Sequence, residues 1–328
     1  MSTTATTIDG AVPPRAGPRS FVDRLRDGDQ IAHIITLIFA ASILVITSML
    51  VYELWVNSHL SRAKFGLAFF WTQTWDPIFD NFGAAPFIYG TLVTAIVSLV
   101  IAVPLGLAAA IFLAELAPRN LSDGIAFLID LLAAVPSVIY GLLGIFVVVP
   151  LMRTVIGPAL KDTLGFLPLF SGPNYGVGFL TAGIVLAIMV VPFIISVSRE
   201  VLLTVPREQR EAALALGATR WEATWKVVVP WARTGIMGSV FLALARALGE
   251  TMAVTMVIGN DPKIRESLLA PGYTIAAVIA NEFTEATGDL YLSALIELGL
   301  VLFLMTFILN GLARLLIIAT ERGGGHPS

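Results

Sequence analysis

The stretch SREVLLTVPREQREAALALGATRWEATWKVVVP, residues 198–230, is a polar insert between apolar segments. It carries too many charges to cross a membrane. Pro206 suits a first helical position, and Glu208 and Glu211 favour the positive N-terminal end of a helix. Gly217 can take the left-handed conformation that ends such a helix. We therefore expect two short helices that meet at Gly217, with a single amphipathic helix on the membrane surface as the alternative.

The composition indicates an integral membrane protein. Of the 328 residues 57% are hydrophobic and only 13% are charged, whereas soluble domains have about 45–50% and 25%. The absence of cysteine excludes disulfides and thiol chemistry, and three scattered histidines predict no metal site. A net charge of −3 without a basic patch predicts no nucleic-acid partner.

Six segments are long and apolar enough to span a bilayer, which takes roughly 20 residues. We expect spans at 31–56, 86–115, 124–150, 176–199, 231–258 and 290–319. Residues 1–30 are interpreted as a disordered cytoplasmic tail, 57–85 as an external loop, 86–320 as the core with a cytoplasmic loop at 204–226, and 321–328 as a second cytoplasmic tail.

The distribution of Lys and Arg predicts the orientation, because cytoplasmic loops carry the excess of both. Most of them fall in the N-terminal tail, in the 198–230 insert and near the C-terminus. The opposite side holds fewer: Arg62, Lys64, Arg153, Lys161, Lys263 and Arg265. Both termini are therefore expected in the cytoplasm.

The 198–230 insert also resembles a known signature. Glu211-Ala212-Ala213, three residues, Gly217, nine residues and then Val227-Val228-Val229-Pro230 is similar to the EAA loop of ABC importer permeases. That resemblance implies a six-helix, type I ABC importer fold whose cytoplasmic coupling helices dock on an ATPase. Glu211, Ala212, Ala213, Gly217 and Pro230 are the residues that it assigns to this coupling.

Three further stretches, at 131–144, 180–206 and 242–260, resemble the PstC family of phosphate importer permeases. The resemblance implies a bacterial inner-membrane subunit that imports phosphate together with a paralogous PstA-like permease. It also implies a PstB-like ATPase dimer and an external PstS-like phosphate-binding protein. This chain has no G-x4-G-K-[ST] phosphate loop, so it is expected to be a transport subunit without a cofactor of its own, with ATP and Mg on the ATPase.

Two charges in the expected fifth span, Arg246 and Glu250, are the strongest site candidates. A charge inside a membrane costs at least about 2.5–3.5 kcal/mol by insertion scales, and residues four apart share a helix face. Arg246 is expected near the centre of the span, where it would contact phosphate while Glu250 holds it in place. The alternative is an internal ion pair that only fixes packing.

Other polar residues are weaker candidates for the pathway. Thr91, Thr94 and Ser98 form one stripe on the second span, although such side chains commonly bond their own helix carbonyls. Ser137 and Tyr140 follow a proline that interrupts the third span, and a broken helix can present N–H groups to an anion. A simple kink remains the alternative there.

Three other functions remain open at this point. A permease for sulfate or molybdate would need the same charges. An ion-driven carrier would need inverted repeats and no docking loop. A membrane scaffold gives no reason for an intramembrane Arg and Glu.

Overall fold

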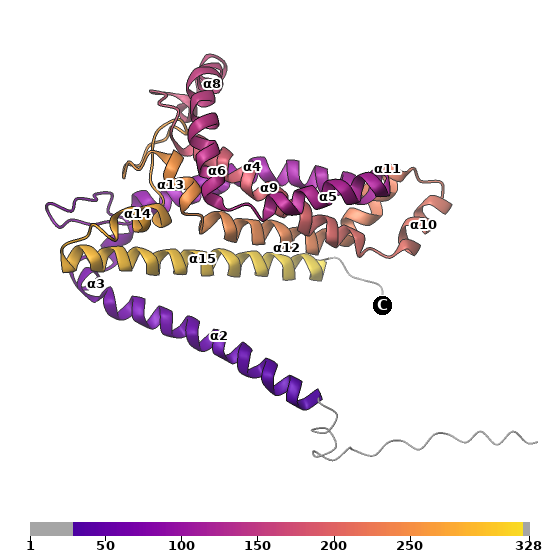
Figure 1. Cartoon of the computed structure of the whole chain (residues 1–328), viewed down its shortest axis with the longest axis horizontal. Helices are drawn as coiled ribbons and strands as arrows, with labels where there is room; N and C mark the ends of the chain where they lie inside the picture. The colour runs from indigo at the N-terminus through magenta and orange to yellow at the C-terminus, as the bar shows by residue number, and fades with distance from the viewer. Residues whose placement is uncertain (1–28, 324–328) are drawn as a thin grey trace, which may run out of the picture. The chain divides into compact units, whose positions relative to one another are not determined.

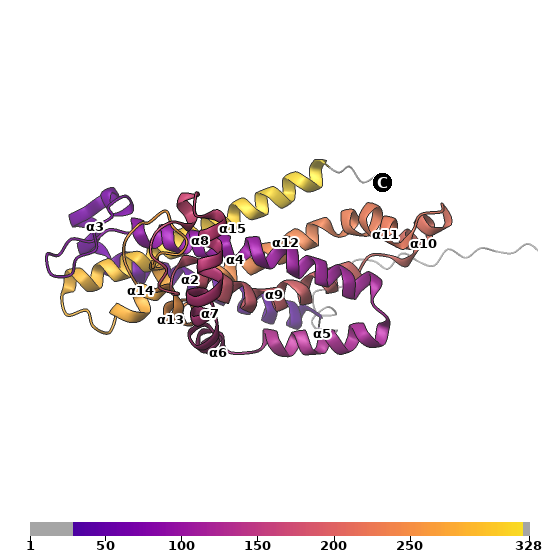
Figure 2. The same cartoon turned by 90° about the horizontal axis from the view of Figure 1, so that it is seen from above.

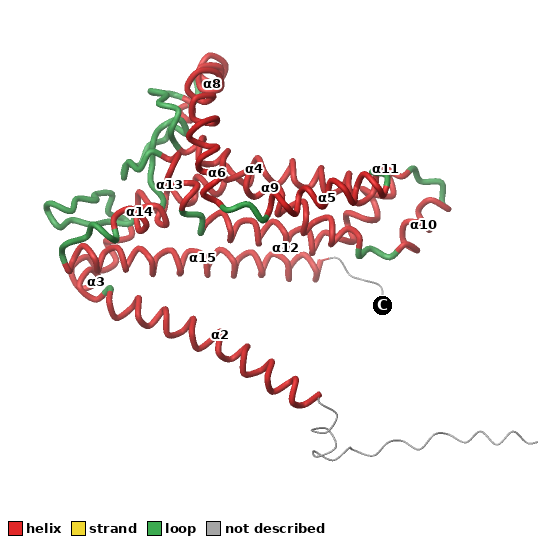
Figure 3. The backbone as a smooth tube through the Cα atoms, viewed as in Figure 1, coloured by secondary structure: helices red, strands yellow, loops and turns green. Residues whose placement is uncertain are grey.

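The computed structural model describes residues 29–323, which are helices and connecting loops (Figures 1 and 3). The expected tail lies outside this range except for its last two residues, and residues 324–328 also lie outside it. The chain divides into two compact units, Met1–Glu53 and Leu54–Ser328. In order, the elements are α2 (Asp29–Asn57), α3 (His59–Phe65), η1 (Gly66–Phe70), α4 (Ala85–Ile111), η2 (Phe112–Leu116), α5 (Arg119–Ala133), α6 (Ser137–Leu143), η3 (Gly144–Val148), α7 (Val149–Leu151), η4 (Met152–Ile156), α8 (Gly157–Leu164), η5 (Pro168–Phe170), α9 (Phe179–Leu203), α10 (Arg207–Ala215), α11 (Arg220–Ala223), η6 (Thr224–Val228), α12 (Val229–Leu248), α13 (Met252–Ile258), α14 (Ile275–Glu282) and α15 (Asp289–Gly323).

Six helical stretches of the described chain are long and apolar enough to cross a membrane. They are Ile31–Asn57, Ala85–Leu116, Ser137–Leu164, Phe179–Leu203, Arg220–Leu248 and Asp289–Ile318. The predicted all-helical, multi-pass architecture is therefore confirmed. Four of the six spans also agree with the expected limits to within a few residues.

The third span is displaced from its expected position at 124–150. Helix α5 ends at Ala133, and a short loop joins it to the spanning stretch that begins at Ser137 (Figure 2). Pro136 accounts for the break, because proline lacks an N–H and disfavours helical geometry in the residue before it. The span therefore continues through Arg153 and Lys161, which were expected in an external loop.

The fifth span also differs from its expected limits of 231–258. It begins at Arg220, inside the polar insert, and ends at Leu248. A separate short helix, α13, follows from Met252 to Ile258. The expected continuous helix through residues 246–250 is therefore wrong, which changes the environment of both charged candidates.

Helices α4 and α9 pack closely at glycine residues in the core of the second unit. A Cβ on Gly183 of α9 would lie 2.4 Å from Val97 Cγ1 of α4, and one on Gly106 of α4 would lie 2.7 Å from Ile194 Cγ2 of α9. Each glycine thus lets the two helices approach more closely than alanine would. The interface between them is filled by fully buried apolar side chains that include Leu186 and Val190.

Four π-helical segments share one sequence feature, which is a proline two residues after their last residue. The segments η2, η3, η4 and η6 precede Pro118, Pro150, Pro158 and Pro230. In η3, η4 and η6 the helix continues past the proline, whose ring would clash with the carbonyl four residues earlier, and a wider π turn relieves that clash. At η2 the chain is already extended at Ala117, and Pro118 follows the end of the helix. Pro230, the last residue of the EAA-like signature, therefore accounts for a wide turn where the polar insert joins α12.

Candidate functional site

The helix break at Gly249 separates the two charged candidates. Helix α12 ends at Leu248, Gly249 follows with φ −92° and ψ 0°, and α13 begins at Met252. Arg246 therefore lies in the last turn of α12, near the end of the span instead of at its centre, while Glu250 lies in the break. The described ion pairs do not include one between these residues, so the expected pair on one helix face is wrong.

Glu250 has a local role at the start of α13. Its Oε1 accepts a hydrogen bond from the backbone N–H of Ala253 at 3.1 Å. The first N–H groups of a helix have no partner within it, and an acidic side chain there is favourable. The carboxylate thus stabilises the helix that follows the break.

Arg246 carries a charge that the described part of the chain does not neutralise. Its side chain is exposed, and its guanidinium carbon lies 6.0 Å from the centre of the Phe193 ring. No hydrogen bond or ion pair of the guanidinium to another described residue is found. A forked, permanently charged donor is thus left available to a group outside this chain.

Helices α6 and α13 pack closely beside this break. A Cβ on Gly141 would lie 2.5 Å from Met256 Sδ, and one on Gly144 would lie 2.6 Å from Val257 Cγ1. The chain after Pro136 and the chain after Gly249 therefore contact each other through the short helices α6 and α13. Tyr140 lies in the same buried cluster as Ala247 and Leu248 at the end of α12.

The candidates on α6 differ in accessibility. Ser137 is the first residue of α6 and is half-buried. Tyr140 is 6% exposed, and its hydroxyl donates to the Leu132 carbonyl at 2.7 Å. The Tyr140 hydroxyl thus ties α6 to the end of α5.

The polar stripe on α4 is buried within the chain. Thr91 and Thr94 are each 2% exposed, and both hydroxyls donate to carbonyls of α4 at 2.8 Å. Thr91 also accepts from the Ile275 N–H at 3.0 Å, and Ser98 is fully buried. These contacts fit the packing alternative for the stripe, and they position α14 beside α4.

The polar insert has the two short helices that the sequence predicts, α10 and α11. Gly217 lies between them with φ +89°, a left-handed conformation that glycine adopts without strain. Thr219 and Glu222 then form a reciprocal capping box at the start of α11. The sequence signal for this second helix start was present in the Thr-x-x-Glu pattern but was not used in the prediction.

Residues of α10, α11 and the turn between them line an open pocket of about 470 Å³, called the hollow below. Ala212, Ala213 and Gly217 line it together with Leu216, which is 91% exposed. Small side chains leave room in the hollow, and an exposed leucine at its edge offers an apolar contact. Glu211 is exposed on α10, and Pro230 is exposed at the start of α12.

An ion pair missed by the sequence reasoning fixes α10 on the spanning helices. Arg210 Nη2 lies 2.7 Å from Glu115 Oε1, and the same nitrogen donates to the Leu202 carbonyl at 2.9 Å. The side chains are only 21% and 9% exposed. The pair joins α10 to the ends of two spans, so a displacement of α10 acts directly on both.

Within residues 31–318 no group of three or more His, Asp and Glu side chains is placed to hold a metal ion. The site therefore consists of one unpaired arginine beside two broken helices, together with a separate hollow on the polar insert.

Comparison with known proteins identifies the family. The model of the family described as binding-protein-dependent transport system inner membrane component matches residues 102–319. The chain is 45% identical to the phosphate transport system permease protein PstC of Mesorhizobium japonicum, over 97% of this chain and 99% of that protein. It is 48% identical to PstC of Xylella fastidiosa, over 89% and 91% of the two chains.

Solved structures support the fold. A bacterial ABC transporter involved in the import of alginate aligns with a TM-score of 0.56 at 16% identity, over 90% of this chain and 98% of that chain. The MetNI methionine ABC transporter in an inward-facing conformation aligns with a TM-score of 0.55 at 16% identity, over 71% and 94%. The chain belongs to the family of binding-protein-dependent transport system inner membrane components, where it groups with the PstC permeases.

Proposed function

We propose that this chain is a permease subunit of an ATP-driven phosphate importer. The observation that carries this proposal is the 45% identity to a phosphate transport system permease along nearly the whole chain. The chain contributes half of a translocation pathway and is not itself an enzyme. ATP and Mg are bound by a separate ATPase subunit, since this sequence has no phosphate loop.

Arg246 is the proposed phosphate contact in the pathway. It is exposed beside the break at Gly249, and its charge is unpaired within the described chain. A guanidinium binds phosphate through two parallel hydrogen bonds. The Phe193 ring centre lies 6.0 Å from the guanidinium carbon, and Ser137 and Tyr140 are proposed to line the pathway from α6.

Glu250 is proposed to assist phosphate selection. Its Oε1 is held by the Ala253 N–H, which fixes the direction of the carboxylate. Hydrogen phosphate can donate a hydrogen bond to a carboxylate, whereas sulfate is fully deprotonated and cannot. Buried Thr91 and Thr94 are assigned to helix packing in this proposal and not to the pathway.

The hollow on the polar insert is the proposed ATPase contact. Ala212, Ala213 and Gly217 line it, and the Arg210–Glu115 pair is proposed to transmit motion of α10 to the spans. Glu211 and Pro230 mark the two ends of this coupling segment. Movement of α11 reaches Arg246 through η6 and α12, which run continuously between them.

The partners follow from the family and remain part of the proposal. They are a paralogous PstA-like permease, a PstB-like ATPase dimer and a PstS-like phosphate-binding protein. The assembly lies in a bacterial cytoplasmic membrane with both termini inside, as the Lys and Arg distribution predicts.

Reconstitution tests the function. The chain is assembled with its partner subunits in vesicles, and labelled phosphate uptake is measured with the binding protein outside and ATP inside. The proposal predicts uptake that requires ATP, survives dissipation of ion gradients and is little reduced by excess sulfate or molybdate. Uptake of sulfate or molybdate in preference to phosphate would assign another oxyanion, and uptake driven by an ion gradient without ATP would exclude an ABC importer.

A further inference from the structure

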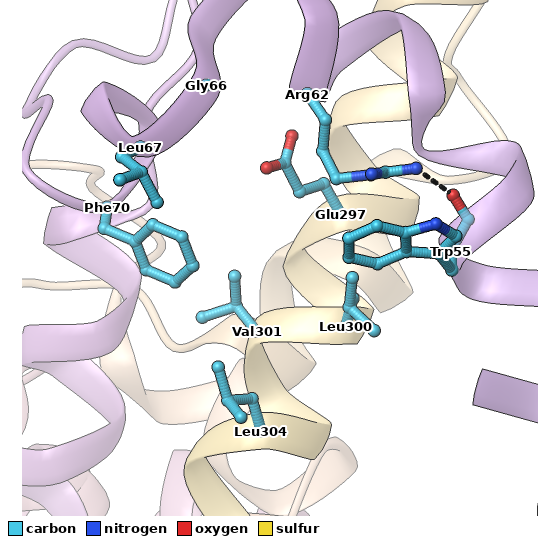
Figure 4. A pocket seen from close by; sticks show the side chains of 9 residues that line it. All are labelled: Trp55, Arg62, Gly66, Leu67, Phe70, Glu297, Leu300, Val301 and Leu304. Carbon is cyan, nitrogen blue, oxygen red and sulfur yellow. Dashed lines mark hydrogen bonds between the residues drawn. The ribbon is translucent and has the colours of Figure 1, made fainter. Parts of the chain in front are cut away.

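A second cavity lies away from Arg246, near the N-terminal end of α15. It has a volume of about 340 Å³ and lies wholly within the second unit. Trp55, Arg62, Phe70, Glu297 and Val301 are among its lining residues (Figure 4). The cavity is largely apolar, with the two charged groups near one end of it.

The Glu297 carboxyl is the group in this cavity that indicates a ligand-binding site. It is 3% exposed, and its Oε2 has no hydrogen-bond partner among the described residues. Figure 4 shows this carboxyl pointing into the space between Arg62 and Phe70. The buried Ser61 hydroxyl lies beside this carboxyl but makes no hydrogen bond of accepted geometry with Oε2. A buried polar atom without a partner is costly, so a stronger donor from outside the chain would be bound favourably here.

Arg62 does not supply that donor. Its guanidinium lies over the Trp55 ring, with 3.6 Å from the guanidinium carbon to the ring centre, and it donates to Ser58 Oγ at 3.0 Å and to the Trp55 carbonyl. The described ion pairs do not join Arg62 to Glu297. The cavity thus presents a positive and a negative group that are held separately.

An apolar groove continues from this cavity along α15. A neighbouring cavity of about 230 Å³ shares Phe70, Val301 and Leu304 with it and extends to Ile308. Leu304 and Ile308 are 44% and 48% exposed. The groove is therefore open along the part of α15 that crosses the hydrocarbon layer, where an acyl chain would fill it.

The depth of the charged end suits a lipid headgroup. Glu297 lies eight residues after Asp289, about 12 Å along the helix. The candidate span of 30 residues is about 45 Å long and the hydrocarbon layer about 30 Å. If the span is centred in the layer, Glu297 lies only a few ångströms inside the boundary with the headgroups.

From these features we infer a binding site for a zwitterionic phospholipid with a primary ammonium headgroup, such as phosphatidylethanolamine. The ammonium donates to Glu297 Oε2, the phosphate contacts Arg62, and one acyl chain lies along Val301 and Leu304. This pair of charged groups should bind the phosphatidylethanolamine headgroup in preference to those of phosphatidylcholine and phosphatidylglycerol. Phosphatidylcholine has no N–H donor for Glu297, and phosphatidylglycerol has no cation.

Lipid binding to the assembled complex tests the inference. The complex is titrated with phosphatidylethanolamine, phosphatidylcholine and phosphatidylglycerol, and the retained lipid is measured by native mass spectrometry. Wild type should retain phosphatidylethanolamine preferentially, and Glu297→Gln should weaken it about tenfold, as the loss of a hydrogen bond to a charged group predicts. Glu285→Gln, which changes an exposed carboxylate outside the cavity, is the matched control and should bind as wild type does.

A second variant tests the groove without changing a charge. Leu304→Trp fills the space for the acyl chain at an exposed position, whereas Leu312→Trp adds the same bulk to α15 outside both cavities. Only the first should reduce lipid retention. Equal retention of the three lipids by wild type, or full phosphatidylethanolamine retention by both Glu297→Gln and Leu304→Trp, would overturn the assignment.

Discussion

Glu250 Oε1 accepts a hydrogen bond from the Ala253 backbone N–H at 3.1 Å and so caps the helix that follows the break at Gly249. No ion pair joins this carboxylate to Arg246 of α12 among the described residues. This relationship leaves the arginine without an internal counter-ion among the described residues. We propose that an anion passing the break completes the coordination of Arg246.

The cap itself gives the first prediction. Glu250→Ala removes the acceptor and should lower the free energy of unfolding by about 1 kcal/mol, the usual effect of losing a cap. Glu250→Gln retains a side-chain carbonyl at the same place and should retain most of that stability. Thermal unfolding of the assembled complex measures both. If the two variants were equally destabilised, the charge and not the cap would be the important feature.

The Arg210–Glu115 pair gives the second prediction. Arg210→Gln leaves a carboxylate that is 9% exposed without its partner, and loss of one member of a buried pair costs about 3 kcal/mol. Thermal unfolding should therefore occur well below the wild-type temperature. Arg207→Gln, which changes an exposed arginine on the same helix, is the control.

A double variant makes this prediction specific. Adding Glu115→Gln to Arg210→Gln removes the uncompensated charge and should recover part of the loss, a coupling of about 1 kcal/mol or more. Strictly additive losses would show that the two side chains do not act together.

Gly217 gives the third prediction, which separates backbone strain from steric clash. No atom lies within 4 Å of a Cβ built on Gly217, so only its φ of +89° opposes substitution. Alanine should destabilise the loop by about 1 kcal/mol, and asparagine should be tolerated better. Proline also removes the N–H that donates to the Leu214 carbonyl, and its fixed φ does not fit the turn.

Co-purification of the ATPase and phosphate-stimulated ATP hydrolysis should decline in the order glycine, asparagine, alanine and proline. The six spans should remain inserted in every variant, as accessibility labelling of the loops can show. Normal ATPase association by Gly217→Pro would contradict the assignment of the coupling loop.

Close packing at Gly144, the first residue of η3, gives the fourth prediction. A Cβ on Gly144 would lie 2.6 Å from Val257 and 3.0 Å from Val185. Gly144→Ala should therefore destabilise the chain by about 1–3 kcal/mol through overpacking. Gly311→Ala, on α15, meets no atom within 4 Å and should be neutral or stabilising. Thermal unfolding compares the two, and equal midpoints would contradict close packing at Gly144.

Hydropathy was sufficient to predict the architecture, because a bilayer requires long apolar helices wherever the chain crosses it. It did not locate the break at Gly249, since the residues from 231 to 258 are apolar on both sides of the break. The side-chain cap by Glu250 decides that break, and a glutamate outside a capping pattern gives no such signal. The depth of Arg246 was mispredicted for the same reason.

The third span shows a related limit. The prediction joined the apolar residues of amphipathic α5 to those after Pro136 in one span, although the proline marked the boundary. Contacts between distant segments were beyond the reach of the sequence. Glu115 and Arg210 are 95 residues apart, and no local pattern pairs them.

We propose above all that Arg246 contacts phosphate during transport. Phosphate uptake by the reconstituted complex should fall at least about tenfold in Arg246→Gln, since a hydrogen bond to a charged group is worth about 1.5–3 kcal/mol. Arg246→Lys should show intermediate uptake, because it retains the charge but not the two-pronged contact. Arg314→Gln, an exposed arginine on α15, should transport as wild type does. Uptake by a stably assembled Arg246→Gln complex at the wild-type rate and phosphate affinity would contradict the claim.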